Sequence, residues 1–277
     1  MTSSKPFYGF GLGLRNEYYT QLLEPTPEVE WLEIISENYF GKGGKPLYYL
    51  DQFAERYPIA MHGVAMNIGS SDPVDLDYLA QLKALIKRVD PIWVSDHCCW
   101  TGVNAHNTHD LLPLPYTDNV VQHYVARIKQ IQDVLERPLL IENLSSYVSF
   151  NDSSMSEWQF LSEICEGANC YLLLDINNIY VSARNHGFDP MDYVRGVPSH
   201  RVRQHHLAGH TDYGTHVIDT HDAPVRDEVF DLYKQCLAHF GAVSTMIERD
   251  DHYPKLSELL SELNKARQIY QHWQIQS

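Results

Sequence analysis

The chain has 277 residues, and its 21 basic and 36 acidic side chains give a formal net charge of −15 at pH 7. Proteins that bind nucleic acid gather Lys and Arg against the phosphate backbone, so this balance argues against nucleic acid as a partner. No stretch approaches the ~20 consecutive apolar residues of a membrane span, and the opening MTSSKPFYGFGLGLR lacks the apolar core of a signal peptide. The five cysteines form no CxxC pair, which favours reduced thiols. We therefore expect a cytoplasmic protein that acts without a membrane.

Short apolar runs alternate with longer amphipathic stretches along the chain, which is the pattern of strands separated by helices. The predicted strands are residues 7–14, 31–35, 59–62, 92–96, 139–142, 171–175, 202–207 and 243–248. The clearest predicted helices are residues 75–89, 117–135, 156–167, 227–240 and 255–271. Residues 176–200 show only a weak helical pattern.

This alternation predicts an α/β fold with a parallel sheet, because a parallel strand must be reached by a crossover connection. Repeated strand–helix units over the whole length favour a closed (β/α)₈ TIM barrel over an open sheet. No Pro- or Ser-rich linker and no abrupt change of charge divides residues 1–277. We therefore predict a single barrel domain.

Ionisable and amide side chains stand where most of the predicted strands end. In chain order these are Glu37 and Asn38, His62, Asp96 and His97, Glu142 and Asn143, Asp175, His206, and Glu248. The carboxyl ends of barrel strands form one rim, so residues remote in sequence become neighbours there. A single His or Asp in such a place is usually a turn former or helix cap, but a whole series of them favours a shared site.

The chemistry of this series points to metal ions. Several buried carboxylates would each cost several kcal/mol unless they met cations. Mixed imidazole and carboxylate ligands without thiolates suit iron, manganese, zinc or cobalt in an open catalytic site. Glu142 ends a central strand, which makes it a candidate to bridge two ions at the ~3.5–4 Å separation of dinuclear sites.

A second group of candidate ligands lies in segments predicted to be loops. Residues 177–189 supply Asn178 and His186, and residues 218–225 supply Asp219 and His221. Asp219 and His221 would lie on the same face of an extended segment, because successive side chains alternate there. His210 follows His206 by four residues and is a further candidate. The alternative is an exposed polar loop without a metal.

Some of the other histidines call for a different interpretation. His205 precedes His206 on the same strand, and neighbouring strand residues point to opposite faces, so only His206 is predicted to face the barrel. His106 and His109 lie in the predicted loop WTGVNAHNTHD, which we interpret as a lid over the site.

The motifs MHGV, SDH, IEN, LLDINN, NHGFD, HLAGH, DTHD and IERD occur in this order along the chain. In this the sequence resembles the multinuclear non-haem iron-dependent oxidative enzymes, a family with a xylose-isomerase-like TIM barrel. The segments GFGLGLR and EIISENYF match as well, so the resemblance covers nearly the whole chain.

The resemblance implies an oxidoreductase with two or three iron ions in the Fe²⁺ and Fe³⁺ states. Its substrate would be a ribosomally synthesised precursor peptide (a RiPP precursor), whose cysteine residues are modified with dioxygen. A separate partner protein that recognises the peptide leader is also expected.

The resemblance also implies which residues hold each ion. One iron would be bound by His62, His97 and Glu142, and a second by Glu142, Asp175, His206 and Glu248. A third, labile ion would be held by Asn178, His186, Asp219 and His221, with His210 at its edge. Glu37, Asn38, Asn143 and Asn177 would orient these ligands through hydrogen bonds. No catalytic residue separate from the metal ligands is predicted.

Other functions remain open on the same barrel. A sugar isomerase or a phosphoester hydrolase would use Zn²⁺ or Mn²⁺ with similar ligands, although Lys is scarce at the predicted strand ends. A zinc endonuclease would need a basic groove for DNA, which the charge of −15 disfavours. The third alternative is a metal-binding protein without catalytic activity.

Overall fold

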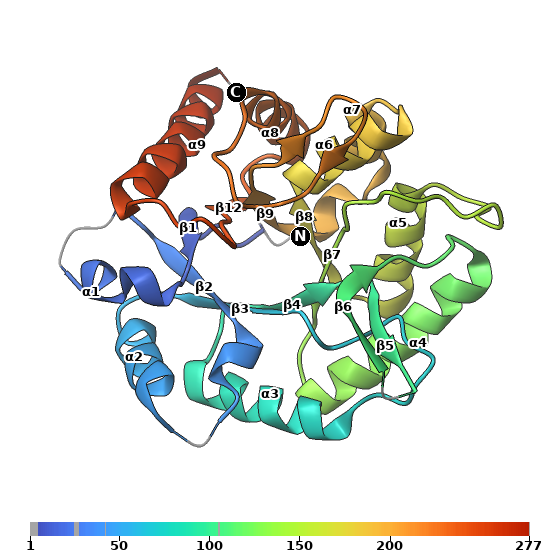
Figure 1. Cartoon of the computed structure of the whole chain (residues 1–277), viewed down its shortest axis with the longest axis horizontal. Coiled ribbons are helices and arrows are strands. Elements are labelled where there is room, and N and C mark those ends of the chain that lie inside the picture. Colours follow the sequence, from blue (N-terminus) through green and yellow to red (C-terminus); the bar gives the residue numbers. More distant parts are fainter. Residues whose placement is uncertain (1–4, 25–27, 42, 105, 277) are drawn as a thin grey trace. The chain divides into compact units, whose positions relative to one another are not determined.

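The computed structural model describes residues 5–24, 28–41, 43–104 and 106–276. Its main sheet is a closed barrel with the strand order β1-β12-β9-β8-β7-β4-β3-β2, and helices follow the successive strands (Figure 1). The neighbours β1–β2, β1–β12, β12–β9, β3–β4 and β4–β7 are all parallel. The predicted (β/α)₈ barrel is confirmed.

Each predicted strand overlaps one strand of the barrel. These strands are β1 (Phe10–Gly13), β2 (Trp31–Ile35), β3 (Ile59–Gly63), β4 (Val94–His97), β7 (Leu140–Glu142), β8 (Tyr171–Asp175), β9 (Val202–Leu207) and β12 (Ser244–Ile247). Gly11 of β1 pairs in register with Trp31 of β2. A Cβ atom at Gly11 would lie 2.5 Å from the Trp31 ring, so this approach requires glycine.

Helices fill the connections between the barrel strands. The α-helices are α1 (Tyr19–Leu22), α2 (Lys45–Ala54), α3 (Leu76–Val89), α4 (Asp118–Leu135), α5 (Glu157–Ala168), α6 (Ile176–His186), α7 (Pro190–Gly196), α8 (Asp227–Phe240) and α9 (Leu256–Gln276), and the 3₁₀ turns are η1 (Asn16–Tyr18), η2 (Ser36–Tyr39) and η3 (Ser199–Arg201). Three predicted helices begin at side-chain caps: Asp75, Thr117 and Ser156 each accept a hydrogen bond from a backbone N–H of the first turn. All five clearly predicted helices are present.

The prediction of loops around Asn178 and His186 is wrong, because both residues lie on α6. Asp175 caps this helix by accepting a hydrogen bond from the Asn178 N–H at 2.7 Å, and Gly187 ends it at φ 77°. The first turn buries polar side chains together with apolar ones, including Asn178 and Ile179. This mixture hides the amphipathic pattern that identifies a helix from sequence.

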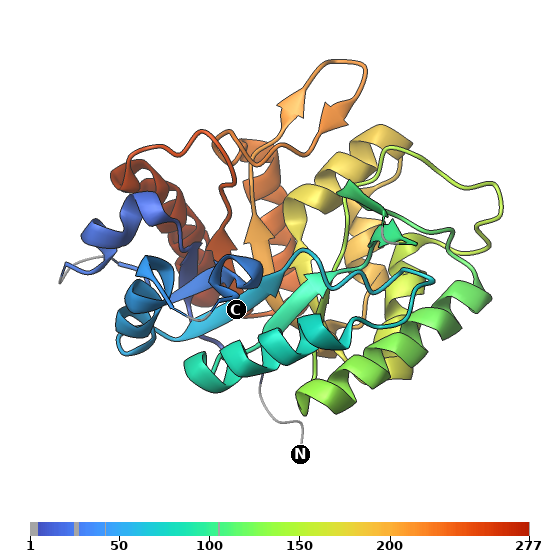
Figure 2. The same ribbon diagram turned by 60° about the horizontal axis from the view of Figure 1, so that its bottom comes forward.

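Two antiparallel hairpins interrupt the strand–helix alternation. The segment predicted as a loop with His106 and His109 is the hairpin of β5 (Trp100–Val103) and β6 (His106–Leu112), and both histidines are exposed. The second hairpin is formed by β10 (Thr211–Asp212) and β11 (Val217–Ile218), and Figure 2 shows it extending past β9. Both hairpins follow the carboxyl end of a barrel strand.

The described residues form two compact units. Unit 1 comprises Met1–Glu33, Ser145–Tyr147 and Leu173–Ser277, and unit 2 comprises Ile34–Leu144 and Val148–Leu172. Fully buried aromatic side chains pack the interior of each, with Tyr193 and Tyr233 in unit 1 and Tyr124 and Phe160 in unit 2. A single domain over residues 1–277 stays a prediction. Across the four described ranges, no helix has the length and apolar character needed to span a bilayer.

Candidate metal centre

Unit 2 contains a buried group of potential metal ligands, which we call the His62 cluster: His62, His97 and Glu142. His62 lies in β3, and His97 and Glu142 end β4 and β7. The Nε2 atoms of both imidazoles are 3.2 Å from Oε2 of Glu142. The exposed fractions are 1% for His62 and Glu142 and 9% for His97. Three of the predicted ligands therefore converge, as expected from their places at strand ends.

Hydrogen bonds on the far side of each ring determine its tautomer. His97 Nδ1 is 3.2 Å from the carbonyl oxygen of Gly63, which can only accept, so Nδ1 carries the proton. His62 Nδ1 is 2.8 Å from Oγ of Ser95, whose hydroxyl donates to another carbonyl and therefore accepts from the ring. Both Nε2 lone pairs then face a carboxylate oxygen. The lone pairs of the two nitrogens and the negative oxygen repel one another. A cation bound between these atoms would be attracted to all three, which makes the cluster suitable for a metal ion.

Unit 1 contains a second buried group, which we call the His206 cluster: Asp175, His206 and Glu248. Asp175 ends β8, His206 lies in β9, and Glu248 follows β12 directly. One ligand atom of each lies within 4.8 Å of the others. His206 Nδ1 is 2.9 Å from Oε2 of Glu248 and 4.0 Å from Oδ2 of Asp175. Asp175 and His206 are fully buried, and Glu248 is 6% exposed.

His221 extends this group through further acidic contacts. Its Nε2 is 2.7 Å from Oδ1 of Asp219, and its Nδ1 is 3.3 Å from Oε2 of Glu248 and 3.2 Å from Oδ2 of Asp250. His221, Glu248 and Asp250 also offer ligand atoms within 4.8 Å of one another. The prediction placed Asp219 and His221 side by side, and the structure brings them into contact.

The charges around His221 explain its protonation in the absence of a metal. Burial lowers the pKa of His221, but the charges of Asp219 and Glu248 outweigh it and raise the pKa well above its usual value. Burial conversely raises the pKa of Glu248, and the charges of His206 and His221 bring it well below its usual value. The imidazolium thus supplies positive charge to carboxylates that would otherwise repel one another.

Asn177 joins two other predicted residues by hydrogen bonds. Its Nδ2 donates to Oδ1 of Asp219 at 2.6 Å, and its Oδ1 accepts from Nδ1 of His210 at 2.7 Å. The His210 ring stacks on Tyr180 with centroids 5.1 Å apart. Asn177 therefore links Asp219 to His210, and the role predicted for it in orienting metal ligands stays a prediction.

Asn178 and His186, predicted to share an ion with His221, occupy different places on α6. Asn178 is buried in the first turn, beside Asp175. His186 lies at the last turn, where Nε2 is 2.8 Å from the hydroxyl of Ser146 and 3.1 Å from its carbonyl oxygen. In the part of the chain that the structure describes, His186 belongs to no group of three potential ligands.

Of the other three residues predicted to orient ligands, Glu37 and Asn143 lie next to the His62 cluster in the chain or through hydrogen bonds, whereas Asn38 is exposed. Glu37, in η2, accepts hydrogen bonds at 2.9 Å from the backbone N–H groups of Val64 and Ala65 and at 2.7 Å from the Tyr78 hydroxyl. It therefore holds the loop that follows His62. Asn143 is fully buried directly after Glu142. Asn38 is exposed, and its side chain makes no hydrogen bond with a described residue.

Three residues at these clusters were not named from the sequence, Glu33, Gln204 and Asp250, and Asp96 was named there only as one of the ionisable residues at strand ends. Glu33 contacts His206, as detailed below, and Asp96 accepts hydrogen bonds from the N–H groups of His97 and Met66. The strand periodicity of two residues already places Gln204 on the same face as His206. The charged residue Glu33 stands inside the apolar run WLEII, which is also a sign in the sequence of a functional position.

Among the described residues, no cysteine belongs to the His62 cluster or to the His206 cluster. Cys98 and Cys99 follow His97 and are buried. Burial raises the pKa of both thiols well above the usual range, which favours the neutral thiol in the absence of a metal. The donor set of imidazoles and carboxylates suits iron, manganese or zinc in a catalytic site rather than a structural zinc site.

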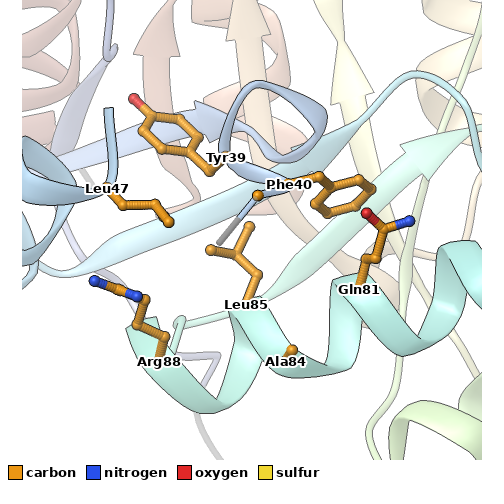
Figure 3. Close-up of a pocket in the computed structure, with 8 residues that line it drawn as sticks. Tyr39, Phe40, Leu47, Gln81, Ala84, Leu85 and Arg88 are labelled. Carbon is orange, nitrogen blue, oxygen red and sulfur yellow. The ribbon is translucent and has the colours of Figure 1, made fainter. Parts of the chain in front are cut away.

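A pocket of about 350 Å³ in unit 2 lies between η2, α2 and α3 (Figure 3). Tyr39, Phe40, Leu47 and Leu85 form apolar walls. Arg88 at its margin already donates two hydrogen bonds of 2.7 Å to the carboxylate of Asp51. None of the predicted ligands lines this pocket.

Relatives cover almost the whole chain. The model of the family described as "RiPP precursor modification enzyme MbnB/TglH/ChrH" matches residues 9–271. A "UPF0276 protein" of Caulobacter vibrioides is 57% identical over 264 residues, which cover 95% of this chain and 94% of the relative. A second, of Acaryochloris marina, is 48% identical over 267 residues, 96% of each chain.

Solved structures show the same fold at low sequence identity. D-psicose 3-epimerase from Clostridium cellulolyticum has a TM-score of 0.64 at 12% identity and covers 95% of this chain and 98% of its own. Endonuclease IV from Thermus thermophilus has a TM-score of 0.59 at 13% identity, with 98% and 100% covered. These likenesses confirm the xylose-isomerase-like TIM barrel and, at such identities, show the fold alone.

Proposed function

Because the chain belongs to the family of RiPP precursor modification enzymes described as MbnB/TglH/ChrH, we propose that it oxidises cysteine side chains of a precursor peptide with dioxygen, at a centre of two or three iron ions. The observation that carries the proposal is the His62 cluster, in which two buried imidazoles direct their Nε2 atoms at one carboxylate oxygen at 3.2 Å each. Buried polar atoms in this arrangement are stabilised by a cation.

The His62 cluster holds one iron, and the His206 cluster holds a second. The group of His221, Glu248 and Asp250, in which both carboxylates face Nδ1 of His221, supports a third ion there, with Asp250 as a ligand that was not predicted from the sequence. Asp219 contacts the other ring nitrogen, Nε2, and stays a predicted ligand of the third ion. The prediction that Glu142 is also a ligand of the second ion remains part of the proposal, as does the prediction that His210, Asn178 and His186 serve the third.

The chain's own residues prepare these sites by fixing ring orientation and charge. Gly63 and Ser95 hold the protons of His97 and His62 on Nδ1, so that the Nε2 lone pairs are available without rearrangement. His221 carries a proton that balances its acidic neighbours until a metal replaces it. Iron, when bound, supplies the redox chemistry that passes electrons from the peptide to dioxygen.

The substrate would reach the centre as a cysteine thiolate and act as an additional ligand. The clusters described here contain no protein thiolate, so a thiolate from the peptide would be the first soft donor that the metals meet. A separate protein that recognises the leader peptide is proposed as the partner that delivers the substrate.

The test is a reaction of iron-loaded protein, prepared without oxygen, with a cysteine-containing precursor peptide encoded beside its gene and the leader-binding protein. We expect a mass change of the peptide only when dioxygen is added, and none for a Cys→Ser peptide. No oxygen-dependent change with the native peptide would contradict the proposal. Zinc as the only metal after anaerobic purification would instead favour the hydrolase or isomerase alternative.

A further inference from the structure

We propose that Glu33 is a positioning residue for the His206 cluster, and that its negative charge makes the ion bound there the one held in the ferric state. The inference rests on the proposed function in taking iron as the bound metal. The residues that carry it, Glu33, Gln204, His206 and the acidic ligands around His206, all belong to unit 1.

Glu33 is a buried carboxylate with a defined partner for each oxygen. It lies in β2 and is 2% exposed. Its Oε1 is 2.9 Å from Nε2 of His206, and its Oε2 accepts a hydrogen bond of 2.6 Å from Nε2 of Gln204. Gln204 is fully buried on the same face of β9 as His206. The carboxylate is therefore held in one orientation by contacts at both oxygens. A buried charge without such partners would be costly and would not be held in this way.

Metal binding defines the tautomer of His206. The Nδ1 atom faces Glu248 at 2.9 Å, so a metal between Asp175, His206 and Glu248 would bind Nδ1. A ring nitrogen bound to a metal carries no proton, and the proton then resides on Nε2. Glu33 Oε1 is its acceptor. Gln204 Nε2 also lies 2.8 Å from His206 Nε2. This contact is a hydrogen bond, donated by the Gln204 amide, only when the proton of the His206 ring is on Nδ1.

The two clusters differ in the charge of these outer partners. In the His62 cluster the Nδ1 protons meet a hydroxyl and a backbone carbonyl, which are both neutral. In the His206 cluster the corresponding partner is the carboxylate of Glu33. A carboxylate that accepts from a metal-bound imidazole makes the ring a stronger donor.

The directly coordinating charges point in the same direction. The His206 cluster contains the carboxylates of Asp175 and Glu248, whereas the His62 cluster is defined by that of Glu142 alone. Negative charge favours the more highly charged ion, and burial strengthens this preference because the interior screens weakly. Fe³⁺ is therefore stabilised over Fe²⁺ at the His206 cluster, and Fe²⁺ is retained at the His62 cluster.

The first experiment measures metal affinity with Co²⁺ alone, by competition with a chelator, so that neither iron nor peptide is needed. Glu33→Gln keeps the size of the side chain and an acceptor for the His206 N–H but removes the charge. We expect this variant to lose about 10- to 100-fold in affinity at one site. Ser95→Ala, which removes the neutral partner of His62, is the matched control at the other cluster.

The second experiment measures the ferric–ferrous equilibrium of ⁵⁷Fe-loaded protein by Mössbauer spectroscopy during a redox titration. We expect Glu33→Gln to shift the equilibrium of one ion at least tenfold towards Fe²⁺, where each tenfold change corresponds to about 59 mV for one electron. Ser95→Ala should leave that ion ferric. Gln204→Met, which frees Oε2 of Glu33, should shift it in the same direction by less and serves if Glu33→Gln does not fold.

The outcomes separate this inference from the proposed function. An unchanged Co²⁺ affinity and ferric fraction in folded Glu33→Gln would overturn the role of Glu33, even if the wild-type protein oxidises its peptide. An equal shift in Ser95→Ala would also overturn it, because the charge of Glu33 would then not be the cause. The predicted shifts in a protein that never modifies a peptide would support Glu33 and refute the function.

Discussion

His206 Nδ1 and Glu248 Oε2 lie 2.9 Å apart, and both side chains are buried in unit 1. Glu248 also faces His221 Nδ1 at 3.3 Å. One carboxylate thus stands between two imidazoles, and the proton of His221 supplies part of the charge that a metal would bring. A change at Glu248 would therefore affect both imidazoles of the proposed metal site at once.

We predict that Glu248→Gln loses the metal of the His206 cluster. The change removes a charge from a direct ligand, so its cost should exceed the about 10- to 100-fold that loss of an outer partner brings. Metal content per chain, measured by ICP-MS after dialysis, should fall. Glu258→Gln, at an exposed position on α9, is the control and should retain full metal content. Equal metal content in both variants would count against the site.

His62→Ala should abolish peptide oxidation while leaving the protein folded. Its imidazole is 1% exposed and supplies one of the Nε2 atoms that face Glu142. The product peak in mass spectrometry should drop more than ~100-fold, because the change removes a residue proposed to bind the metal directly. His239→Ala, at an exposed position on α8, is the matched control and should react at close to the wild-type rate. Retained activity of His62→Ala would exclude the cluster from catalysis.

Removal of metal should destabilise the protein, because cations in the proposed sites would relieve the repulsion among the buried carboxylates. A ligand that binds only the folded state at 100 times its Kd stabilises it by about 2.7 kcal/mol. For a chain of this size that corresponds to a Tm increase of roughly 5–10 °C. Thermal unfolding of dialysed protein, with and without Fe²⁺ under anaerobic conditions, measures the difference. An identical Tm in the two samples would mean that the clusters bind no ion.

Gly63→Ala should both destabilise unit 2 and disturb the His62 cluster. A Cβ atom at this position would lie 2.5 Å from Oδ2 of Asp96 and 3.1 Å from the Tyr78 hydroxyl, and the Gly63 carbonyl orients His97. Such overpacking costs about 1–3 kcal/mol in the free energy of unfolding, which urea denaturation measures. Gly43→Ala meets no atom within 4 Å and should change stability by less than about 0.5 kcal/mol.

His205 should make the protein less stable in mild acid. Burial lowers its pKa to about 3, whereas the unfolded chain takes up the proton near pH 6.5. Its contribution is therefore fully present above pH 6.5 and is lost as pH falls towards 3, because the unfolded state binds the proton first. Between pH 6.5 and pH 5 this loss amounts to about 2 kcal/mol.

His205→Phe tests this pH dependence. The ring already packs against Tyr233 and Phe240, with centroids 6.2 and 5.8 Å apart, so an apolar ring suits the position. The free energy of unfolding of the variant should fall less between pH 6.5 and pH 5 than that of the wild-type protein. Equal slopes in metal-free samples would show that His205 does not titrate on unfolding.

The fold and much of the candidate site followed from local patterns. Strand–helix alternation predicted the barrel, because apolar periodicity reports which face of each element is buried. Polar residues ending apolar strands identified Glu142 and Glu248, because the carboxyl ends of barrel strands meet at one rim. The family resemblance then supplied iron, dioxygen and the peptide, and the comparisons confirm the family, whose description is that of RiPP precursor modification enzymes.

Other features depended on which atoms meet across the fold. The hydrogen bond between Glu33 and Gln204 joins residues 171 positions apart on β2 and β9, which are not neighbours in the barrel, so only the closed sheet brings the two side chains together. Nothing local distinguishes His186, which contacts Ser146, from a ligand. Sequence by itself determined which strand ends carry ligand chemistry, since that depends on residue type and periodicity. Only the tertiary structure decided which partner holds each imidazole, because register and side-chain orientation arise when distant strands pair.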